Sequence, residues 1–348
     1  MSSSRQRVPL AETESPYFVG VDVGGTNIKI GVVDDQARPV AYDSLPTEIE
    51  KGPEDATGRI AKVIDSLLDE AGVDPAKVDG VGLGTPGIQD VPTGMLVRPH
   101  NLKGWDDFPI RDRLAEHTHW PVTFANDANA AAFGEYWAGS GRGRNSMLLL
   151  TLGTGIGGGI IIEDRTIDGE HSLGGECGHI VIDISDRARD CPCGGVGHLE
   201  AYASATALVK FAQEAIAAGR STSLKARTAA GESMTPLLIA EEANQGDVLA
   251  RELIFDTTRY LGVGIASFVH VIDPDAIVLG GAMTFGRNST ALGREFLQHV
   301  REETVKQVLH VLADKLTIDY AILGSDAGFI GAAGLARVAS RERRANGC

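Results

Sequence analysis

The segment GGECGHIVIDISDRARDCPCGGVGHLE, residues 174–200, concentrates more reactive side chains than any other stretch of this chain. Its acidic, imidazole and thiol groups are those of Glu176, His179, Cys191, Cys193, His198 and Glu200. Thiolate and neutral imidazole are the ligands that tetrahedral zinc prefers, and glycines let a loop fold around a small ion. Four of these residues are candidate zinc ligands, namely His179, Cys191, Cys193 and His198. Two buried cysteines and two unrelated histidines would produce the same letters by chance.

The residues around these candidate ligands resemble the zinc loop of the ROK family of bacterial sugar kinases, in which a GxExGH segment is followed by CxCGxxGCxE. The matching positions are Gly174, Glu176, Gly178, His179, Cys191, Cys193, Gly194, Gly197 and Glu200. One position departs from the family pattern, because His198 stands where the family has its third cysteine. Since histidine also binds zinc, the resemblance implies a structural Zn²⁺ site of two cysteines and two histidines.

Composition indicates a soluble protein with room for two lobes. A chain of 348 residues is long enough to bury a sizeable core. Its formal net charge of −15 disfavours contact with nucleic acid and with anionic membranes. The four cysteines are too few for a disulfide scaffold, and no apolar run approaches membrane length. We therefore expect a cytoplasmic protein with no nucleic-acid or membrane partner, preceded by a disordered leader over residues 1–16.

Short apolar runs alternate with amphipathic stretches, and this order predicts an α/β fold. Strands are expected at residues 17–22, 28–33, 38–45, 78–83, 122–125, 146–152, 160–163, 276–279 and 317–323. Helices are expected at residues 53–71, 128–138, 200–218, 247–271 and 327–340. A strand, a Gly-Thr turn and a second strand occur once in each half of the chain, which indicates a duplicated fold.

Three glycine-rich turns follow predicted strands, in VDVGGTNIK (residues 21–29), GTGIGGG (153–159) and VLGGAM (278–283). Phosphate oxygens need backbone N–H donors, and the Mg²⁺ that accompanies ATP needs a carboxylate or its waters. Each turn alone is equally typical of a structural hairpin. In this order, however, the three resemble the phosphate-1, phosphate-2 and adenosine segments of the actin-like ATPase superfamily, to which the ROK kinases belong.

The resemblance extends over about residues 17–337 and implies a two-lobed actin-like ATPase fold, which is a duplicated ribonuclease H-like α/β fold. Its small lobe would comprise residues 17–125 and the C-terminal helix 327–348. The large lobe would comprise residues 126–326 with the zinc loop. The implied contacts to ATP and Mg²⁺ are Asp22, Gly24, Gly25, Thr26, Lys29, Gly153, Thr154, Gly155, Gly157, Gly280 and Gly281.

The tetrapeptide from Asn126 to Asn129 lies between a predicted strand and a predicted helix. A carboxylate at this place can accept a proton from an attacking alcohol, but helix capping would also favour these residues. The segment resembles NDANAAA of the ROK kinases, whose aspartate is the catalytic base. The resemblance therefore implies that Asp127 is the base and that Asn126 and Asp127 contact the sugar.

A second sugar-binding candidate is Asn101, in NLKGW at residues 101–105. An Asx-turn with Trp105 as a packing anchor is the alternative. The segment resembles NLxGW of ROK glucokinases, where the asparagine contacts the hexose. Glu176, His179 and Glu200 resemble the residues that bind the remaining sugar hydroxyls. If one ring nitrogen of His179 binds zinc, the other can face the sugar, and the metal then orients the histidine.

The activity implied by the resemblance is ATP-dependent phosphorylation of a hexose at its 6-hydroxyl, with glucose as the expected sugar and a homodimer as the expected assembly. N-acetylmannosamine kinase, fructokinase and mannokinase remain open, because the sugar-site residues are similar across the family. The adenosine-type segment disfavours polyphosphate as the donor. The rival class is a sugar-sensing ROK transcription regulator, which would carry an added helix-turn-helix and a basic face. The short leader and the charge of −15 disfavour that class.

Overall fold

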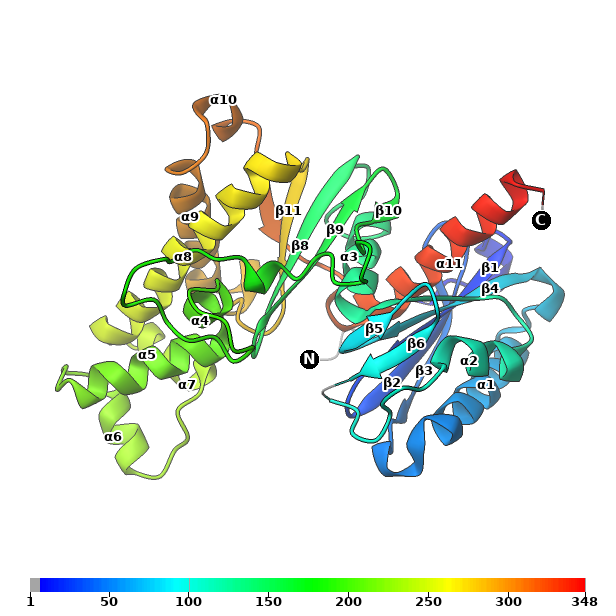
Figure 1. Ribbon diagram of the computed structural model, residues 1–348, viewed down its shortest axis with the longest axis horizontal. Coiled ribbons are helices and arrows are strands. Elements are labelled where there is room, and N and C mark those ends of the chain that lie inside the picture. Colours follow the sequence, from blue (N-terminus) through cyan, green and yellow to red (C-terminus); the bar gives the residue numbers. More distant parts are fainter. Residues whose placement is uncertain (1–6, 100, 348) are drawn as a thin grey trace. The chain divides into compact units, whose positions relative to one another are not determined.

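The computed structural model describes residues 7–99 and 101–347, which divide by their contacts into two compact units (Figure 1). The first unit is formed by Met1–Asn145, Gly159–Gly175 and Ile322–Cys348. The second is formed by Ser146–Gly158 and Glu176–Ala321. Strands and helices alternate along both units, which confirms the α/β class.

The first unit is built on a five-stranded sheet. Across this sheet the strands are β3 (Pro39–Pro46), β2 (Asn27–Val33), β1 (Tyr17–Val23), β4 (Val78–Thr85) and β7 (Val122–Asn126). The first three strands of the chain form an antiparallel meander, whereas β4 and β7 run parallel to β1. A separate two-stranded sheet pairs β5 (Ile88–Asp90) with β6 (Met95–Arg98). All five strands of the main sheet agree with the sequence prediction to within two residues.

Strand β1 is buried on both faces, which explains its nearly continuous apolar sequence. Val19, Val21 and Val23 join the core under α1 (Gly52–Ala71), while Phe18 packs with Phe329 on the other face. Helix α1 ends at Ala71, as predicted, and the next residue, Gly72, has a φ of 66°, the left-handed conformation of a C-cap. In Figure 1, α1 and α2 (Ile110–Thr118) cover one face of the sheet and α11 (Ala327–Ala345) covers the other.

Glycines in the central strands let α11 lie directly on the backbone of the sheet. A Cβ on Gly20 would lie 1.8 Å from the carbonyl oxygen of Phe329, and a Cβ on Gly82 would lie 1.8 Å from that of Ala332. No side chain fits at either position. The glycine content of these strands therefore reflects close packing as well as the turns that follow them.

Helix α3 (Asp127–Trp137) packs against α11 in the first unit. Its residue Glu135 is only 1% exposed. The carboxylate accepts hydrogen bonds from the N–H groups of Ser140 (3.0 Å), Ile322 (3.2 Å) and Leu323 (2.8 Å). The first compact unit extends to Asn145, whereas the resemblance implies a lobe boundary at residue 125.

The leader predicted to be disordered over residues 1–16 is partly ordered. Residues 1–6 lie outside the described residues, so the prediction there stays as it is. From residue 7 onward the prediction does not hold, because backbone hydrogen bonds join Val8 N–H to Pro39 and Asp35 N–H to Glu14. A short 3₁₀ turn, Leu10–Glu12, lies between these contacts.

The second sheet of the molecule has the order β10-β9-β8-β11-β12. Its strands are β8 (Ser146–Leu152), β9 (Ile156–Ile162), β10 (Arg165–Thr166), β11 (Ala276–Gly280) and β12 (Thr317–Tyr320). Strand β11 runs parallel to β8 and to β12. Strand β9 begins four residues before the predicted start at residue 160, and β12 ends three residues before the predicted end at residue 323.

The helices of the second unit are α4 (Glu200–Ala203), α5 (Ala205–Ala217), α6 (Leu224–Ala229), α7 (Pro236–Asn244), α8 (Val248–Ile272), α9 (Ala291–Val305) and α10 (His310–Ala313). The prediction of a single helix over residues 200–218 is wrong, because the structure has two helices there, α4 and α5. Ser204 interrupts it in an extended conformation, and its hydroxyl accepts from Ala207 N–H as the N-cap of α5. None of the described helices combines the length and apolarity that a membrane crossing requires.

Candidate active site and metal centre

The predicted site residues fall into two groups, one in each unit. The first unit carries Asp22, Gly24, Gly25, Thr26, Lys29, Asn101, Asn126 and Asp127. The second carries Gly153, Thr154, Gly155, Gly157, Glu176, His179, Cys191, Cys193, His198, Glu200, Gly280 and Gly281.

Asp22 is the penultimate residue of β1 and faces Lys29 of β2 across the hairpin. The ammonium nitrogen of Lys29 lies 3.4 Å from Asp22 Oδ2 and also donates to the carbonyl oxygen of Ser325 at 3.0 Å. Burial raises the pKa of Asp22, and the charge and hydrogen bond of Lys29 oppose this rise. A Cβ on Gly328 would lie 2.5 Å from the Asp22 carboxylate, so the start of α11 also confines this acid.

The carboxyl ends of three parallel strands bring Asp22 and Asp127 to one edge of the first sheet. In the register, Asp22 of β1 faces Gly84 of β4, and Thr85 of β4 faces Asn126 of β7. Two strand spacings separate β1 from β7, or about 10 Å. Asp127 follows Asn126 directly, so both acids lie on the side where ligands bind to open α/β sheets.

Helix capping at the start of α3 is performed by Asn126. Its Oδ1 accepts from the N–H of Ala128 at 2.8 Å and of Asn129 at 3.4 Å. Asp127 is the first helical residue, and its Oδ1 accepts from Ala128 N–H at 2.9 Å. The capping alternative raised by the sequence thus applies to Asn126, and Asp127 is placed at the positive end of the helix dipole.

Asn101 is exposed and lies beside the first glycine turn. A Cβ on Gly25 would lie 3.4 Å from the carbonyl oxygen of Asn101. Trp105 is 1% exposed, and its indole N–H donates to the carbonyl of Ile49 at 3.2 Å. Trp105 is therefore a packing anchor, as the Asx-turn alternative predicted. It holds a segment that leaves the Asn101 side chain accessible.

The second glycine turn joins β8 to β9 in the second unit. Gly153 N–H donates to the carbonyl of Gly155 at 3.0 Å, which closes the turn. The start of α5 holds it from the other side, because Ala205 N–H donates to the carbonyl of Gly153 and Thr206 Oγ1 to that of Thr154. The turn is therefore fixed in place before any ligand arrives.

A cavity of about 530 Å³ adjoins this turn within the second unit. Apolar groups of α7 and of the segment after β11 form much of its wall, among them Pro236, Leu237, Ala240, Met283 and Phe285. Gly153 and Thr154 line it as well, at the phosphate-turn end. Its size and apolar wall suit a purine base. Helix α7 was not predicted from the sequence, although Thr235 at its N-cap and Pro236 in its first turn are typical of a helix start.

Gly280 and Gly281 are not among the lining residues of that cavity, although the next two residues are. A Cβ on Gly281 would lie 2.3 Å from the carbonyl of Leu152, and its φ is 88°. The glycine therefore permits the chain to pass close to β8, which positions Met283 at the cavity.

The four candidate zinc ligands are brought together by the loop at 177–198. One donor atom from each of His179, Cys191, Cys193 and His198 lies within 4.8 Å of every other. Cys193 Sγ is 3.1 Å from His198 Nδ1, and Cys191 Sγ is 3.9 Å from His179 Nδ1. Ligands on a tetrahedral zinc lie about 3.3 to 3.8 Å apart. The donor chemistry therefore fits Zn²⁺, including His198 in the place of the family cysteine, and the two sulfur–nitrogen separations fall just below and just above this range.

The two nitrogens of His179 face different groups. Nδ1 points to the cysteine side, while Nε2 lies 3.7 Å from the carboxylate of Glu176. This is the arrangement expected of a histidine that binds metal with one nitrogen and presents the other to a ligand. Cys177 is buried nearby and is not part of the cluster, and burial raises the pKa of its thiol to about 12.

Comparisons with known proteins agree with this arrangement. The model of the ROK family matches residues 18–339. A glucokinase of Halalkalibacterium halodurans is 35% identical over 315 residues, covering 90% of this chain and 93% of that protein. A glucokinase of Thermotoga maritima is 31% identical, covering 91% and 96%. A xylose repressor of Caldicellulosiruptor bescii is 28% identical, covering 82% of this chain and 69% of the repressor.

Two solved structures are similar over nearly the whole chain. The ROK hexokinase from Thermus thermophilus has a TM-score of 0.80 and 34% identity, covering 94% of this chain and 99% of that one. A ROK family glucokinase from Streptomyces griseus, in complex with glucose and AMPPNP, has a TM-score of 0.69 and 32% identity, covering 92% and 99%.

Proposed function

The chain belongs to the ROK family, and we propose that it is an ATP-dependent kinase that phosphorylates glucose at the 6-hydroxyl. The relatives from H. halodurans and T. maritima are glucokinases, and the S. griseus structure holds glucose with the ATP analogue AMPPNP. The observation that carries the proposal is that two neighbouring side chains have different roles at the start of α3. Asn126 caps the helix, and Asp127 stands at its first position.

Asp127 is the proposed general base. Its carboxylate takes the proton from O6 as that oxygen attacks the γ-phosphorus, the bond from phosphorus to the bridging oxygen of ADP breaks, and glucose 6-phosphate and ADP leave. Phosphoryl transfer needs mainly positioning and charge neutralisation, so the protein has to supply a base and a set of backbone donors beside the metal ion that accompanies ATP. The carboxylate stands at the start of α3, where the positive end of the helix dipole favours a negatively charged group.

The nucleotide is assigned to the two glycine turns and the cavity of the second unit. Backbone N–H groups of the turns at Gly24–Thr26 and Gly153–Gly157 would bind phosphate oxygens, and the cavity at Met283 would hold the adenine. Asp22 and its partner Lys29 would face the phosphates. Mg²⁺ bound with ATP neutralises phosphate charge, and the half-buried carboxylate of Asp22 is the residue suited to hold its waters.

The sugar is assigned to Asn101, Asn126, Asp127, Glu176, His179 and Glu200. Asparagine amides donate and accept, and carboxylates accept from sugar hydroxyls, so this set can orient several hydroxyls at once. The cysteine–histidine cluster fits Zn²⁺, whose role would be structural, since it would fix the ring of His179. Cytoplasmic location and a homodimer are proposed from the family alone.

A panel of sugars tests the proposed function. Wild-type protein with ATP and Mg²⁺ should convert glucose to glucose 6-phosphate, with kcat/KM above that for fructose, mannose and N-acetylmannosamine. Polyphosphate in place of ATP should give little product. A higher kcat/KM for another sugar would reassign the substrate within the family. The absence of any sugar phosphorylation, together with sugar-dependent DNA binding by this chain, would favour a regulator such as the xylose repressor.

A further inference from the structure

Asn129 is the one polar residue of the Asn126–Asn129 motif that the proposed mechanism leaves without a role. It is 3% exposed, and its amide nitrogen donates to Asp168 Oδ1 at 2.7 Å. We infer that Asn129 and Asp168 are a positioning pair that holds the start of α3, and with it Asp127, against the loop that leads to the sugar-contacting residues. The inference rests on the proposed function, because it takes Asp127 as the base.

The hydrogen bond to Asp168 is what sets the orientation of the Asn129 amide. Among the described residues, Asn129 Oδ1 is buried and has no hydrogen-bond partner. A flipped amide would place this oxygen against the carboxylate oxygen of Asp168 and leave the nitrogen without an acceptor. The second oxygen of Asp168 is also engaged, since Thr166 Oγ1 donates to Oδ2 at 2.8 Å. The carboxylate therefore joins β10 to α3.

Close packing leaves the first turn of α3 little room to move. A Cβ on Gly159 would lie 3.2 Å from Asn129 Oδ1, 3.0 Å from the carbonyl of Ala128 and 2.5 Å from the Cβ of Ala132. The backbone of β9 thus lies directly on the helix. Asn129 is two residues from Asp127, so the bond that fixes its side chain also fixes the backbone from which the base projects.

Asp168 also closes the loop that follows it. Its carbonyl oxygen accepts from Gly174 N–H at 2.6 Å, and Ser172 Oγ in the same loop accepts from Val91 N–H at 3.0 Å. Glu176 comes two residues after Gly174. Asp168 thus joins α3, which carries the proposed base, to the loop that leads to Glu176, a proposed sugar contact. Displacement of either α3 or this loop would misplace the reacting groups.

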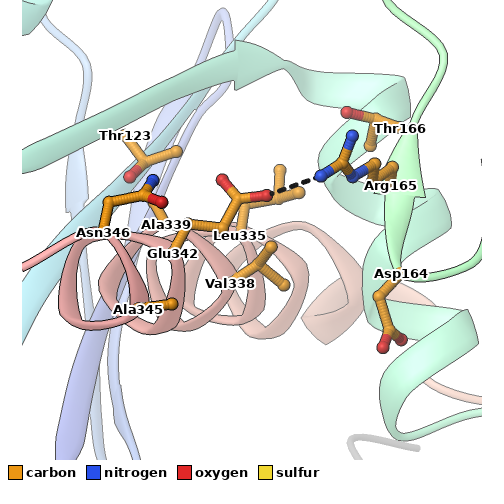
Figure 2. Close-up of a pocket in the computed structure, with 10 residues that line it drawn as sticks. All are labelled: Thr123, Asp164, Arg165, Thr166, Leu335, Val338, Ala339, Glu342, Ala345 and Asn346. Carbon is orange, nitrogen blue, oxygen red and sulfur yellow. Dashed lines mark hydrogen bonds and ion pairs between the residues drawn. The ribbon is translucent and has the colours of Figure 1, made fainter.

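Thr166 offers a way to perturb the pair from outside the proposed site. It lines a second cavity, of about 620 Å³, between β10 and α11, whose described lining residues include none of the predicted site residues. Figure 2 shows Thr166 beside Arg165, whose guanidinium forms a 3.2 Å ion pair with Glu342 of α11. Thr166→Val keeps the volume of the side chain and removes only the hydroxyl that donates to Asp168.

The kinetic test uses the full-length protein with ATP, Mg²⁺ and glucose. Asp168→Ala and Asn129→Ala should each lower kcat by about 10- to 100-fold, because a displacement of about 1 Å at a reacting group costs this much. The KM for ATP should stay within about twofold, since the nucleotide is assigned to other residues. The double variant should be no slower than the slower single variant, as expected of two residues acting as a unit.

Asp168→Asn separates positioning from charge. An asparagine oxygen still accepts from Asn129, and its amide can donate to the Thr166 hydroxyl, so at least about half of wild-type kcat should return. Asp79→Ala is the matched control, because it removes a carboxylate that accepts from Ser340 Oγ at 3.0 Å in the same unit. Its melting temperature should fall while kcat and both KM values hold.

The outcomes are distinct. Wild-type kinetics in Asp168→Ala, or damage by Asp168→Asn as large as by Asp168→Ala, would overturn the positioning role. If Asp168→Ala does not fold, the Thr166→Val variant provides the test. Its kcat should fall about two- to fivefold, which is the order of effect expected from one weakened hydrogen bond. An unchanged kcat in Thr166→Val would contradict the positioning role. A wild-type protein that phosphorylates no sugar would instead defeat the proposed function on which this inference rests.

Discussion

Glu200 lies between the second glycine turn and the sulfur of Cys191. Its Oε1 is 3.8 Å from Cys191 Sγ, and its Oε2 accepts from Ile156 N–H at 2.9 Å. A proposed sugar ligand thus contacts both the candidate zinc cluster and the first residue of β9, which lies in the phosphate turn. We expect changes in the turn to reach the sugar as well as the nucleotide.

The first prediction concerns the proposed base. Asp127→Asn should bind glucose normally and lower kcat by about 10² to 10⁴, because an amide cannot take the proton from O6. Glucose binding by calorimetry, set beside steady-state kinetics, separates the two effects. A folded variant that binds glucose and keeps near-normal kcat would return Asp127 to a structural role at the start of α3.

The second prediction follows from the position of Glu200. A Cβ on Gly155 would lie 2.2 Å from Glu200 Oε2. Gly155→Ala should therefore displace this carboxylate and raise the KM for glucose as well as for ATP, each by about three- to tenfold. The sequence alone predicts damage to ATP binding only, since it marks the turn as a phosphate cradle. A change in the KM for ATP alone would show that the carboxylate adapts without cost.

A control for this variant lies in the neighbouring cavity. Ala240 lines the wall assigned to the adenine, and Ala240→Leu would occupy part of that space. Its KM for ATP should rise by about tenfold, and its affinity for glucose measured without ATP should not change. Equal loss of both affinities would indicate that α7 supports the whole unit and not the nucleotide alone.

The sequence predicts those elements whose stabilising contacts lie between residues that are close together along the chain. Strand β1 and the capped end of α1 follow from apolar periodicity and from Gly72, and both were predicted. The break at Ser204 was missed, because serine inside an apolar helical pattern signals a cap only when its hydroxyl is seen to accept from Ala207. Helix α9 was also missed, although Leu292, Phe296 and Val300 recur along it at helical spacing.

The site shows the same limit. Motifs predict roles for Asp22, Asp127 and the candidate zinc ligands, because each motif groups its residues along the chain. Asn129 and Asp168 are 39 residues apart, and their hydrogen bond depends on how β10 packs next to α3. Two of the three backbone donors around Glu135, those of Ile322 and Leu323, are likewise distant in sequence. A repeated asparagine beside the proposed base was the only available signal for the positioning pair.

The third prediction concerns Asp22 and pH. Burial raises the pKa of Asp22 above its ordinary value of 3.8, so the folded protein favours the protonated acid. Stability from this group is complete below that ordinary value and is lost as pH rises through the higher folded pKa. Asp22→Asn should therefore melt about 1 to 3 °C above wild type at neutral pH, with a gap that closes in acid.

Activity provides the second half of this test. The same Asp22→Asn variant should lose most of its ATP-dependent turnover, since the proposed contact to the waters of Mg²⁺ is gone. Lys29→Met should have the opposite effect on stability, because it removes the charge that opposes the rise in the pKa of Asp22. A lower melting temperature for Asp22→Asn at neutral pH would mean that the pair with Lys29 outweighs the burial of the acid.

The last prediction concerns zinc and the unusual ligand His198. Purified without a histidine tag, the protein should contain one zinc per chain, bound by two sulfurs and two nitrogens in X-ray absorption. His198→Ala should lower zinc affinity at least about tenfold and raise the KM for glucose, because His179 loses the bond that fixes its ring. His198→Cys should keep both metal and activity, and His310→Ala, which removes an exposed histidine of α10, should change neither. A zinc site with a single nitrogen ligand in the wild type, or full zinc content in His198→Ala, would leave His198 as an ordinary loop residue despite its 3.1 Å approach to Cys193.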